Sequence, residues 1–84
     1  MENSMTANLD RVREVIATTF ELPPEKVNRE SSSQTIEEWD SVAHINLVMA
    51  LEEKFGTSFT MEEIAEMHDV MTICKVIEAK NHQG

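Results

Sequence analysis

The clearest pattern of apolar positions in the chain lies between residues 41 and 56. Apolar side chains recur there every three or four residues, which is the spacing of one face of an α-helix. Asp40 and Ser41 favour a helix N-cap, because a side-chain oxygen can accept an otherwise unpaired backbone N–H. Gly56 easily takes the left-handed conformation that ends many helices. The pattern predicts an amphipathic helix between these ends, with a core face formed by Ala43, Leu47, Val48, Leu51 and Phe55.

The same helix carries a second apolar line, which the core face does not include. Val42, Ile45 and Met49 recur at helical spacing and lead into Glu52 and Glu53. A surface helix usually has polar or charged side chains opposite its core face. An exposed apolar strip beside carboxylates is typical of a docking surface, although these side chains would be core in a more broadly buried bundle. We interpret them as facing a partner.

Three other segments have helical patterns. An amphipathic segment starts near residue 6 and ends near residue 21 or 22, because the proline pair at 23–24 cannot continue a helix. Thr60 and Glu63 have capping-box spacing and predict a short helix after them. Asp69 is placed to cap a further helix, which frays into the polar C-terminal tail.

Residues 28–38 form a long polar connection between the first two helices. Long loops are uncommon in small compact domains unless they are functional or disordered. A single helical turn is predicted just before this connection, with Val27 packed against the core. Ile36 and Trp39 are the apolar residues that we expect to pin the connection to the bundle.

The length and composition fit one small domain. The chain has 84 residues, of which 40% are apolar, with two glycines, two prolines and no tyrosine. This composition argues against a β-sandwich or a barrel. We predict an all-α fold, a small four-helix bundle with three long helices, one short helix and a long first loop. The single domain spans residues 1–84, and residues 1–5 and 80–84 are expected to be disordered.

The chain is acidic, and its charge is unevenly distributed. The formal net charge is −9, of which residues 31–84, with three basic and ten acidic side chains, contribute −7. An acidic domain repels nucleic acid and anionic membranes, which are therefore not expected as partners. It is attracted instead to proteins with basic patches. Charge alone also keeps many small proteins in solution, so this signal gains weight only with a motif.

No metal site, disulfide or membrane segment is predicted. Cys74 is the single cysteine, so the chain has no internal disulfide, and we expect this residue in the core. His44, His68 and His82 lack metal-ligand spacing with one another or with Cys74. No apolar run is long enough to span a bilayer, and the N-terminus lacks a signal-peptide pattern. We therefore expect a cytoplasmic location.

One stretch resembles the acyl carrier proteins: Trp39-Asp40-Ser41-Val42, followed by Leu47-Val48-Met49-Ala50-Leu51-Glu52-Glu53 and Phe55. In that family a serine in an Asp-Ser-Leu type motif, at the start of the second helix, carries 4′-phosphopantetheine. The similarity continues from Thr60 to Ile77, and the length matches a free-standing carrier. An Asp-Ser pair alone is a weak signal, but its combination with the helix pattern, the size and the acidity is specific.

The resemblance implies a carrier and not an enzyme. A phosphopantetheinyl transferase would attach the phosphopantetheine of coenzyme A to Ser41. The terminal thiol would hold an acyl group as a thioester and deliver it to enzymes of fatty acid, lipid or polyketide-type biosynthesis. These enzymes would bind a monomeric carrier through basic patches, and the expected partner-binding residues are Asp40, Val42, His44, Ile45, Met49, Glu52 and Glu53.

Three residues depart from the pattern of the carriers of fatty acid synthesis. Val42 stands where leucine is usual, and Asn46 and Lys54 stand where that group often has acids. A carrier of a specialised pathway therefore fits the resemblance at least as well as a housekeeping carrier.

The residues alone leave other interpretations of Ser41 open. A serine at such a position is most often only a helix cap, which would leave a helical interaction module without a prosthetic group. An aminoacyl or peptidyl carrier shares the bundle, but it usually has glycine-rich flanks that Glu37-Glu38-Trp39 lack. A hydrolase that uses Ser41 and His44 would also need an orienting acid and oxyanion donors in a dry pocket. We expect His44 to contact the prosthetic arm, and Trp39 either to shield Ser41 or to pack.

Overall fold

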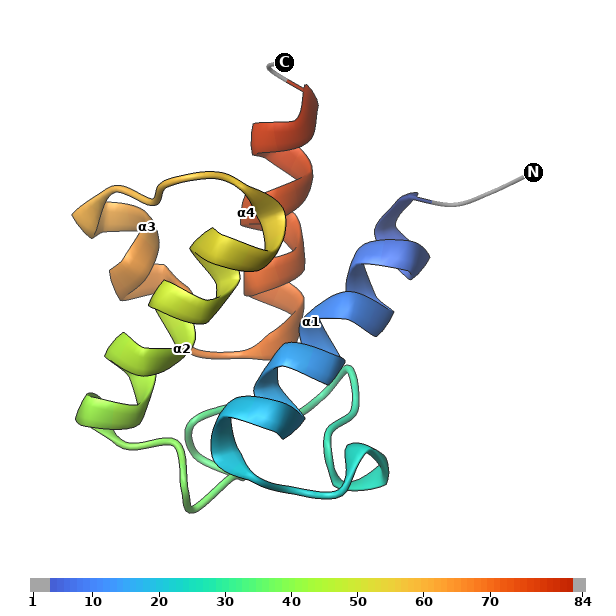
Figure 1. Ribbon diagram of the computed structural model, residues 1–84, viewed down its shortest axis with the longest axis vertical. Helices are drawn as coiled ribbons and strands as arrows, with labels where there is room; N and C mark the ends of the chain where they lie inside the picture. The colour runs from blue at the N-terminus through green and yellow to red at the C-terminus, as the bar shows by residue number, and fades with distance from the viewer. Residues whose placement is uncertain (1–3, 83–84) are drawn as a thin grey trace.

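The computed structural model describes residues 4–82, and the surroundings of the side chains for residues 8–80. Within this part the chain is all-helical, with four α-helices, one 3₁₀ turn and an isolated bridge between Ser32 and Asp69 (Figure 1). The predicted all-α bundle with one short helix is confirmed. The elements are α1 (Ser4–Phe20), η1 (Pro24–Lys26), α2 (Ser41–Phe55), α3 (Met61–Glu66) and α4 (Val70–His82).

Helix α1 packs against both α2 and α4, and the three helices enclose one apolar core (Figure 1). The core face predicted for α2 is confirmed, since Leu47, Val48 and Leu51 are buried while Ala43 and Phe55 pack partly against the core. Burying one such aliphatic side chain stabilises a fold by about 1.5–3 kcal/mol. The fully buried residues are Val12, Ile16, Val27, Leu47, Leu51, Met67, Val70, Ile73, Cys74 and Ile77.

The connection between α1 and α2 crosses one end of the bundle and is fastened to the turn before α4 (Figure 1). The backbone N–H of Ser33 donates to the carbonyl of His68 at 2.9 Å, and the N–H of Val70 donates to the carbonyl of Ser31 at 3.0 Å. The long connection is therefore built into the fold, and its end fixes where α2 begins. Its buried apolar side chains are Val27, Ile36 and Trp39, as the sequence predicts.

Side-chain caps define the starts of three helices. Asp40 Oδ1 accepts a first-turn N–H of α2 at 2.8 Å. Thr60 and Glu63 form a reciprocal capping box at α3, with donor–acceptor distances of 3.1 and 2.8 Å. Asp69 Oδ1 accepts a first-turn N–H of α4 at 2.7 Å. All three caps confirm the prediction, because each one depends only on neighbouring residues.

Two helices end in a left-handed residue. Gly56 follows α2 with a φ of 63°, and Glu21 follows α1 with a φ of 58°. After α1, the N–H of Leu22 donates to the carbonyl of Ala17 at 2.8 Å, which is the pairing of a Schellman motif. The proline pair correctly predicts the end of α1. A glutamate in the left-handed conformation is not predictable from the sequence, because glycine or asparagine usually marks such a position.

The described helices extend closer to both termini than the sequence pattern indicates. Residues 4–5 and 80–82 are helical, whereas the pattern places them in disordered ends. Residues 1–3 and 83–84, which were also expected to be disordered, lie outside the described part. Lys80 Nζ pairs with Glu63 Oε1 at 3.0 Å and lies over the ring of Phe59. These tertiary contacts give the last turns of α4 partners that a polar sequence does not reveal.

None of the described helices is both long enough and apolar enough to cross a membrane.

Replacing the two left-handed residues should change the stability in opposite directions. Gly56→Ala adds a Cβ in a conformation that costs an L-residue about 1–2 kcal/mol, and no atom lies near enough to add a clash. Its thermal unfolding midpoint should therefore fall by about 5 °C. Glu21→Gly should raise the midpoint by a smaller amount, because glycine relieves the same strain but makes the unfolded chain more flexible. Shifts of the same sign in both variants would contradict this explanation.

The buried thiol of Cys74 should be unreactive in the native protein. Burial in the core, and to a smaller extent the charge of Glu78, raises the pKa of Cys74 from 9.0 to about 11. Because only the thiolate reacts, we expect a thiol reagent to leave the native chain unlabelled at mildly alkaline pH and to label it rapidly in denaturant. The native thiol holds its proton longer than the unfolded one, so stability should decline as the pH rises from 9.0 to about 11. Rapid labelling of the folded chain would show that Cys74 is not buried.

Candidate functional site

Ser41 is the first residue of α2, and its side chain is exposed. It follows the long connection directly, so it lies at the end of the bundle where the chain turns into the helix (Figure 1). Its hydroxyl makes no hydrogen bond with the residues that the structure describes. The unpaired backbone N–H groups of the first helical turn give this end of α2 a partial positive charge. Ser41 therefore presents an accessible hydroxyl in a fixed, electropositive backbone setting.

Asp40 fixes the start of the helix from the position just before Ser41. Its carboxylate accepts the N–H of Ala43 at 2.8 Å, and its backbone carbonyl accepts the N–H of His44, also at 2.8 Å. The residue is nevertheless exposed. The capping role predicted for Asp40 is thus confirmed, while its recognition by a partner stays a prediction.

His44 lies one turn after Ser41, and both of its ring nitrogens are bonded within the fold. The indole N–H of Trp39 donates to Nδ1 at 3.0 Å, and Nε2 lies 2.9 Å from the carbonyl oxygen of Ile64 in α3. An indole N–H can only donate, so Nδ1 must accept and the neutral ring carries its proton on Nε2. His44 therefore links the connection, α2 and α3, a role that its sequence position does not indicate.

Trp39 is buried, and it contacts aromatic rings from two directions. Its ring lies edge to edge with that of His44, with a centroid distance of 6.2 Å and an interplanar angle of 23°, and it packs at a tilt on Phe20, the last residue of α1, at 5.7 Å. Of the two roles considered for Trp39, the packing role is the one that these contacts support.

Ser41 and His44 do not have the arrangement of a nucleophile and its base. A catalytic histidine needs one ring nitrogen free to take the proton of the serine, with a third group orienting the other nitrogen. Here Nδ1 faces an indole and Nε2 faces a backbone carbonyl. In the part of the chain that the structure describes, no group of three His, Cys, Asp or Glu side chains is placed to hold a metal ion.

A shallow groove of about 590 Å³ adjoins Ser41. It is open to solvent and lies between the first turns of α2 and the turn before α4. Its walls combine hydroxyl, imidazole and carboxylate groups with an apolar side chain, so it suits a ligand with both polar and apolar segments. The lining residues are Ser33, Trp39, Asp40, Ser41, His44, Ile45 and His68.

The second apolar line of α2 lies outside the core. Val42, Ile45 and Met49 are 72%, 52% and 59% exposed, which agrees with their interpretation as surface residues. We call these three residues the exposed strip. Met61, at the start of α3, is also 86% exposed, which the sequence analysis did not predict. Large apolar side chains gathered on the surface of a small protein are typical of an interaction site.

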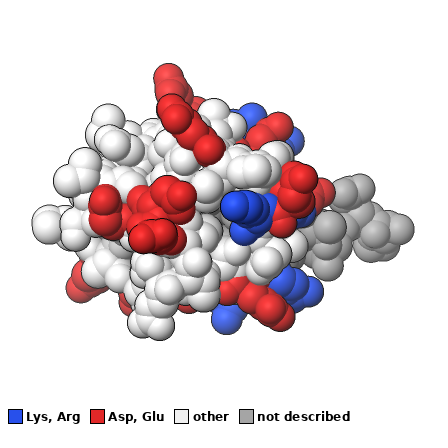
Figure 2. All heavy atoms as spheres, turned by 90° about the horizontal axis from the view of Figure 1, so that it is seen from below, with Lys and Arg blue, Asp and Glu red and all other residues white. Residues whose placement is uncertain are grey.

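The acidic residues after the strip have different environments. Glu52 Oε2 accepts the backbone N–H of Phe59 at 3.0 Å, so this carboxylate has an intramolecular role that the sequence did not predict. Glu53 is exposed. Figure 2 shows the end of the bundle from which α2 starts: the basic groups of this face lie in the right half of the view, and the left half shows only acidic and uncharged groups. The surface near the start of α2 is therefore attractive to a basic partner.

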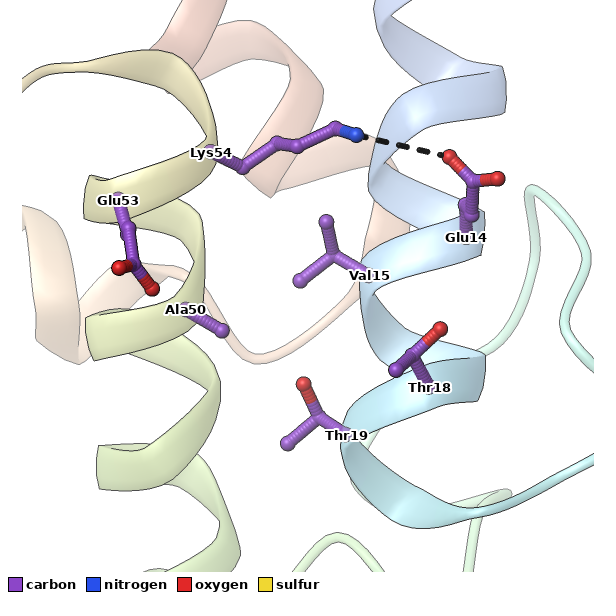
Figure 3. A pocket seen from close by; sticks show the side chains of 7 residues that line it. All are labelled: Glu14, Val15, Thr18, Thr19, Ala50, Glu53 and Lys54. Atoms are coloured by element: carbon purple, nitrogen blue, oxygen red, sulfur yellow. Dashed lines mark ion pairs between the residues drawn. The ribbon is translucent and has the colours of Figure 1, made fainter.

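A second groove lies between α1 and the later part of α2 (Figure 3). Lys54 reaches across it, with its Nζ 3.8 Å from Oε1 of Glu14 and with Val15 and Ala50 below the pair. Both charged groups are exposed, so the pair contributes only about 0–1 kcal/mol. Its main effect is on the charge pattern, because it directs the ammonium group of Lys54 towards α1.

The sequence is similar to three curated acyl carrier proteins. A protein from Thermosynechococcus vestitus is 33% identical over 72 residues, which cover 86% of this chain and 89% of that protein. Acyl carrier protein 3 of Ralstonia nicotianae is 31% identical over 71 residues, covering 84% of this chain and 82% of the relative. A protein from Wolinella succinogenes is 35% identical over 72 residues, covering 86% and 95%.

The fold is similar to that of the holo acyl carrier protein from Geobacter metallireducens, determined by NMR in solution. The TM-score is 0.80 at 25% identity, with 90% of this chain and 87% of that chain covered. A family model described as the phosphopantetheine attachment site matches residues 10–77. Such proteins are carriers rather than enzymes, and their prosthetic group is covalently bound 4′-phosphopantetheine. Because this match extends over most of its length and three acyl carriers are its relatives, the chain belongs to the acyl carrier protein family.

Proposed function

We propose that Ser41 carries the 4′-phosphopantetheine and that the chain presents acyl groups, held as thioesters, to enzymes of a biosynthetic pathway. The observation that carries this proposal is the exposed hydroxyl of Ser41 on the first turn of α2, directly after the Asp40 cap. The Asp-Ser motif singles out the same residue. The names of the three relatives support an acyl cargo over an aminoacyl one.

The start of α2 suits the charge of a modified serine. A phosphodiester on Ser41 would lie at the N-terminal end of a 15-residue helix, where unpaired N–H groups favour an anion by about 0.3–1 kcal/mol. The bond between Asp40 and the N–H of Ala43 holds the neighbouring carboxylate in place. Modification would therefore add negative charge to an end of the molecule that already attracts basic partners.

The groove beside Ser41 fits a phosphopantetheine arm, which combines amide groups with short alkyl segments. Ser33 and His68 offer polar groups there, and Ile45 offers an apolar one. These three residues would hold the part of the arm nearest the phosphate. When bound, the arm supplies a terminal thiol whose thioester keeps the acyl carbonyl reactive. The openness of the groove leaves the far end of the arm free to enter a partner enzyme.

Members of this family interact with phosphopantetheinyl transferases and with biosynthetic enzymes. We propose that both kinds of enzyme contact the exposed strip, with the carboxylates of Asp40 and Glu53 directed at basic side chains around it. Exposed charges steer association but are screened by salt, so binding should be fast, weak and sensitive to ionic strength. Glu52 contributes less than the sequence suggests, because its carboxylate is bonded to Phe59.

We further propose that the pathway is a specialised lipid, polyketide or cell-surface pathway. Val42 and Asn46 support this, since both lie on α2 and depart from the pattern of the carriers of fatty acid synthesis. Lys54 is weaker support, because its charge is paired with Glu14 on the α1 side of the helix. A monomeric state and a cytoplasmic location stay predictions.

The attachment site can be tested by intact mass after incubation with coenzyme A, magnesium and a broad-specificity phosphopantetheinyl transferase. The wild-type chain should gain the mass of one phosphopantetheine. Ser41→Ala should gain none, because it lacks the acceptor oxygen. Ser33→Ala is the matched control, since it removes a second serine of the same groove, and it should be modified like the wild type. Full modification of folded Ser41→Ala would sink the assignment.

The exposed strip can be tested with one substitution at two positions. Met49→Gln keeps the length and helix propensity of the side chain but removes its apolar character in the strip, and Met61→Gln does the same outside the strip. Both variants should unfold within about 0.5 kcal/mol of the wild type, because both side chains are exposed. The KM of the transferase for the carrier should rise about fivefold for Met49→Gln only, which corresponds to ~1 kcal/mol of lost contact. Equal KM values for the two variants would contradict the role of the strip.

A further inference from the structure

We propose that His44 is a positioning residue: by bonding to Trp39 and to Ile64 at once, it holds the segment that carries Ser41 in the geometry that the transferase recognises. This inference rests on the attachment of phosphopantetheine to Ser41. It goes beyond that proposal by assigning His44 a role that it performs through Trp39 and Ile64, whereas its contact with the arm or a partner stays a prediction.

The first step is the closure of a short ring of chain around Ser41. The side chains of Trp39 and His44 are joined by a hydrogen bond of 3.0 Å, which holds the two rings edge to edge with an interplanar angle of 23°. Asp40 and Ser41 lie between them in the sequence. The side chains of the first and last residues of segment 39–44 are thus bonded to each other. This restricts the segment to few backbone conformations in which it can present the Ser41 hydroxyl.

The second step is the anchoring of this ring to the rest of the bundle. On the α1 side, Trp39 packs against Phe20. On the α3 side, His44 Nε2 lies 2.9 Å from the carbonyl oxygen of Ile64, which belongs to the last turn of that helix. This carbonyl oxygen also accepts the N–H of Met67, the residue after α3, at 3.2 Å, and its second lone pair is available to an external donor. The segment around Ser41 is therefore held in place from two helices other than its own.

The third step is the chemical requirement that only one form of the histidine ring can meet. The indole donates and the carbonyl accepts, so the ring must accept at Nδ1 and donate from Nε2. A ring protonated at Nδ1 would place two donors opposite each other at the buried indole. Alanine supplies neither bond and leaves the indole N–H without its acceptor.

The fourth step is the expected consequence for recognition. If loss of the His44 bonds leaves the Ser41 segment in the recognised geometry only about a tenth of the time, the apparent affinity of the transferase falls about tenfold. The chemical step on the bound carrier should be nearly unchanged, so the effect belongs in KM and not in kcat. A purely structural role would lower the unfolding temperature without raising the KM measured on folded protein.

The experiment compares His44→Ala, which removes the bridge between Trp39 and α3, with Met61→Ala, which truncates an exposed side chain of α3 outside the groove beside Ser41. Three quantities are measured on unmodified, folded protein: the ¹⁵N shifts of the His44 ring, the hydrogen exchange of the Trp39 indole and of the α3 amides, and the KM of the transferase. Trp39 is the single tryptophan, so its indole signal is unambiguous.

We expect the wild-type ring to carry its proton on Nε2. His44→Ala should speed exchange of the indole and of the α3 amides about tenfold, leave exchange of the α1 core amides unchanged, and raise the KM about tenfold at similar kcat. Met61→Ala should match the wild type in all three. If His44→Ala does not fold, Trp39→Phe replaces it, because it removes the same indole donor and keeps an aromatic ring beside Phe20.

Two results would overturn the proposal: a wild-type ring protonated on Nδ1, or an unchanged KM in a folded variant that has lost the indole–imidazole bond. Failure of the wild type to be modified would instead remove the function proposed for Ser41. In that case the exchange of the indole and of the α3 amides still decides whether His44 holds the segment, and unchanged exchange in His44→Ala would overturn the inference.

Discussion

The burial of the Trp39 indole is the constraint on which much of the structure depends. A buried N–H without an acceptor costs about 1–3 kcal/mol, so a fold that encloses this ring must also bring an acceptor to it. The acceptor is His44, and its use of Nδ1 directs the remaining N–H towards Ile64. The burial of this one side chain therefore constrains four parts of the fold: the end of α1, the connection, the first turn of α2 and the end of α3.

The same constraint explains how a small bundle can include a long connection that keeps one fixed conformation. A chain of this size has little apolar surface to bury, so each segment without regular structure must contribute to the core. Val27 and Ile36 do so along the connection, and backbone bonds to His68 and from Val70 fasten it to the turn before α4. The exposed strip is then the only part of α2 whose apolar side chains do not serve the core, which is consistent with selection for contacts outside the molecule.

The features that the sequence predicted depend on residues close together in the chain, and the features that it did not predict depend on residues far apart. The helix faces, the caps at Asp40, Thr60 and Asp69, and the stop at Gly56 depend on residues a few positions apart, and all were predicted. The bond from His44 to Ile64 spans 20 residues, and the pairing of Lys80 with Glu63 requires α3 and α4 to be packed first. Such contacts depend on tertiary geometry, so no local sequence pattern predicts them. The motif predicts Ser41 as the attachment residue, whereas the bonds of Trp39 and His44 beside it are visible only in the structure.

The burial of Cys74 has a consequence for a molecule whose cargo is an activated acyl group. A thioester is exchanged readily by a thiolate, so a reactive cysteine in the carrier itself would compete for the cargo with the partner enzymes. The core removes this competitor in two ways, by shielding the sulfur and by keeping it protonated, with a pKa of about 11. A chain that bears a thiol arm and an unreactive cysteine therefore behaves as a molecule with one thiol. Its acyl group cannot move from the arm to its own cysteine.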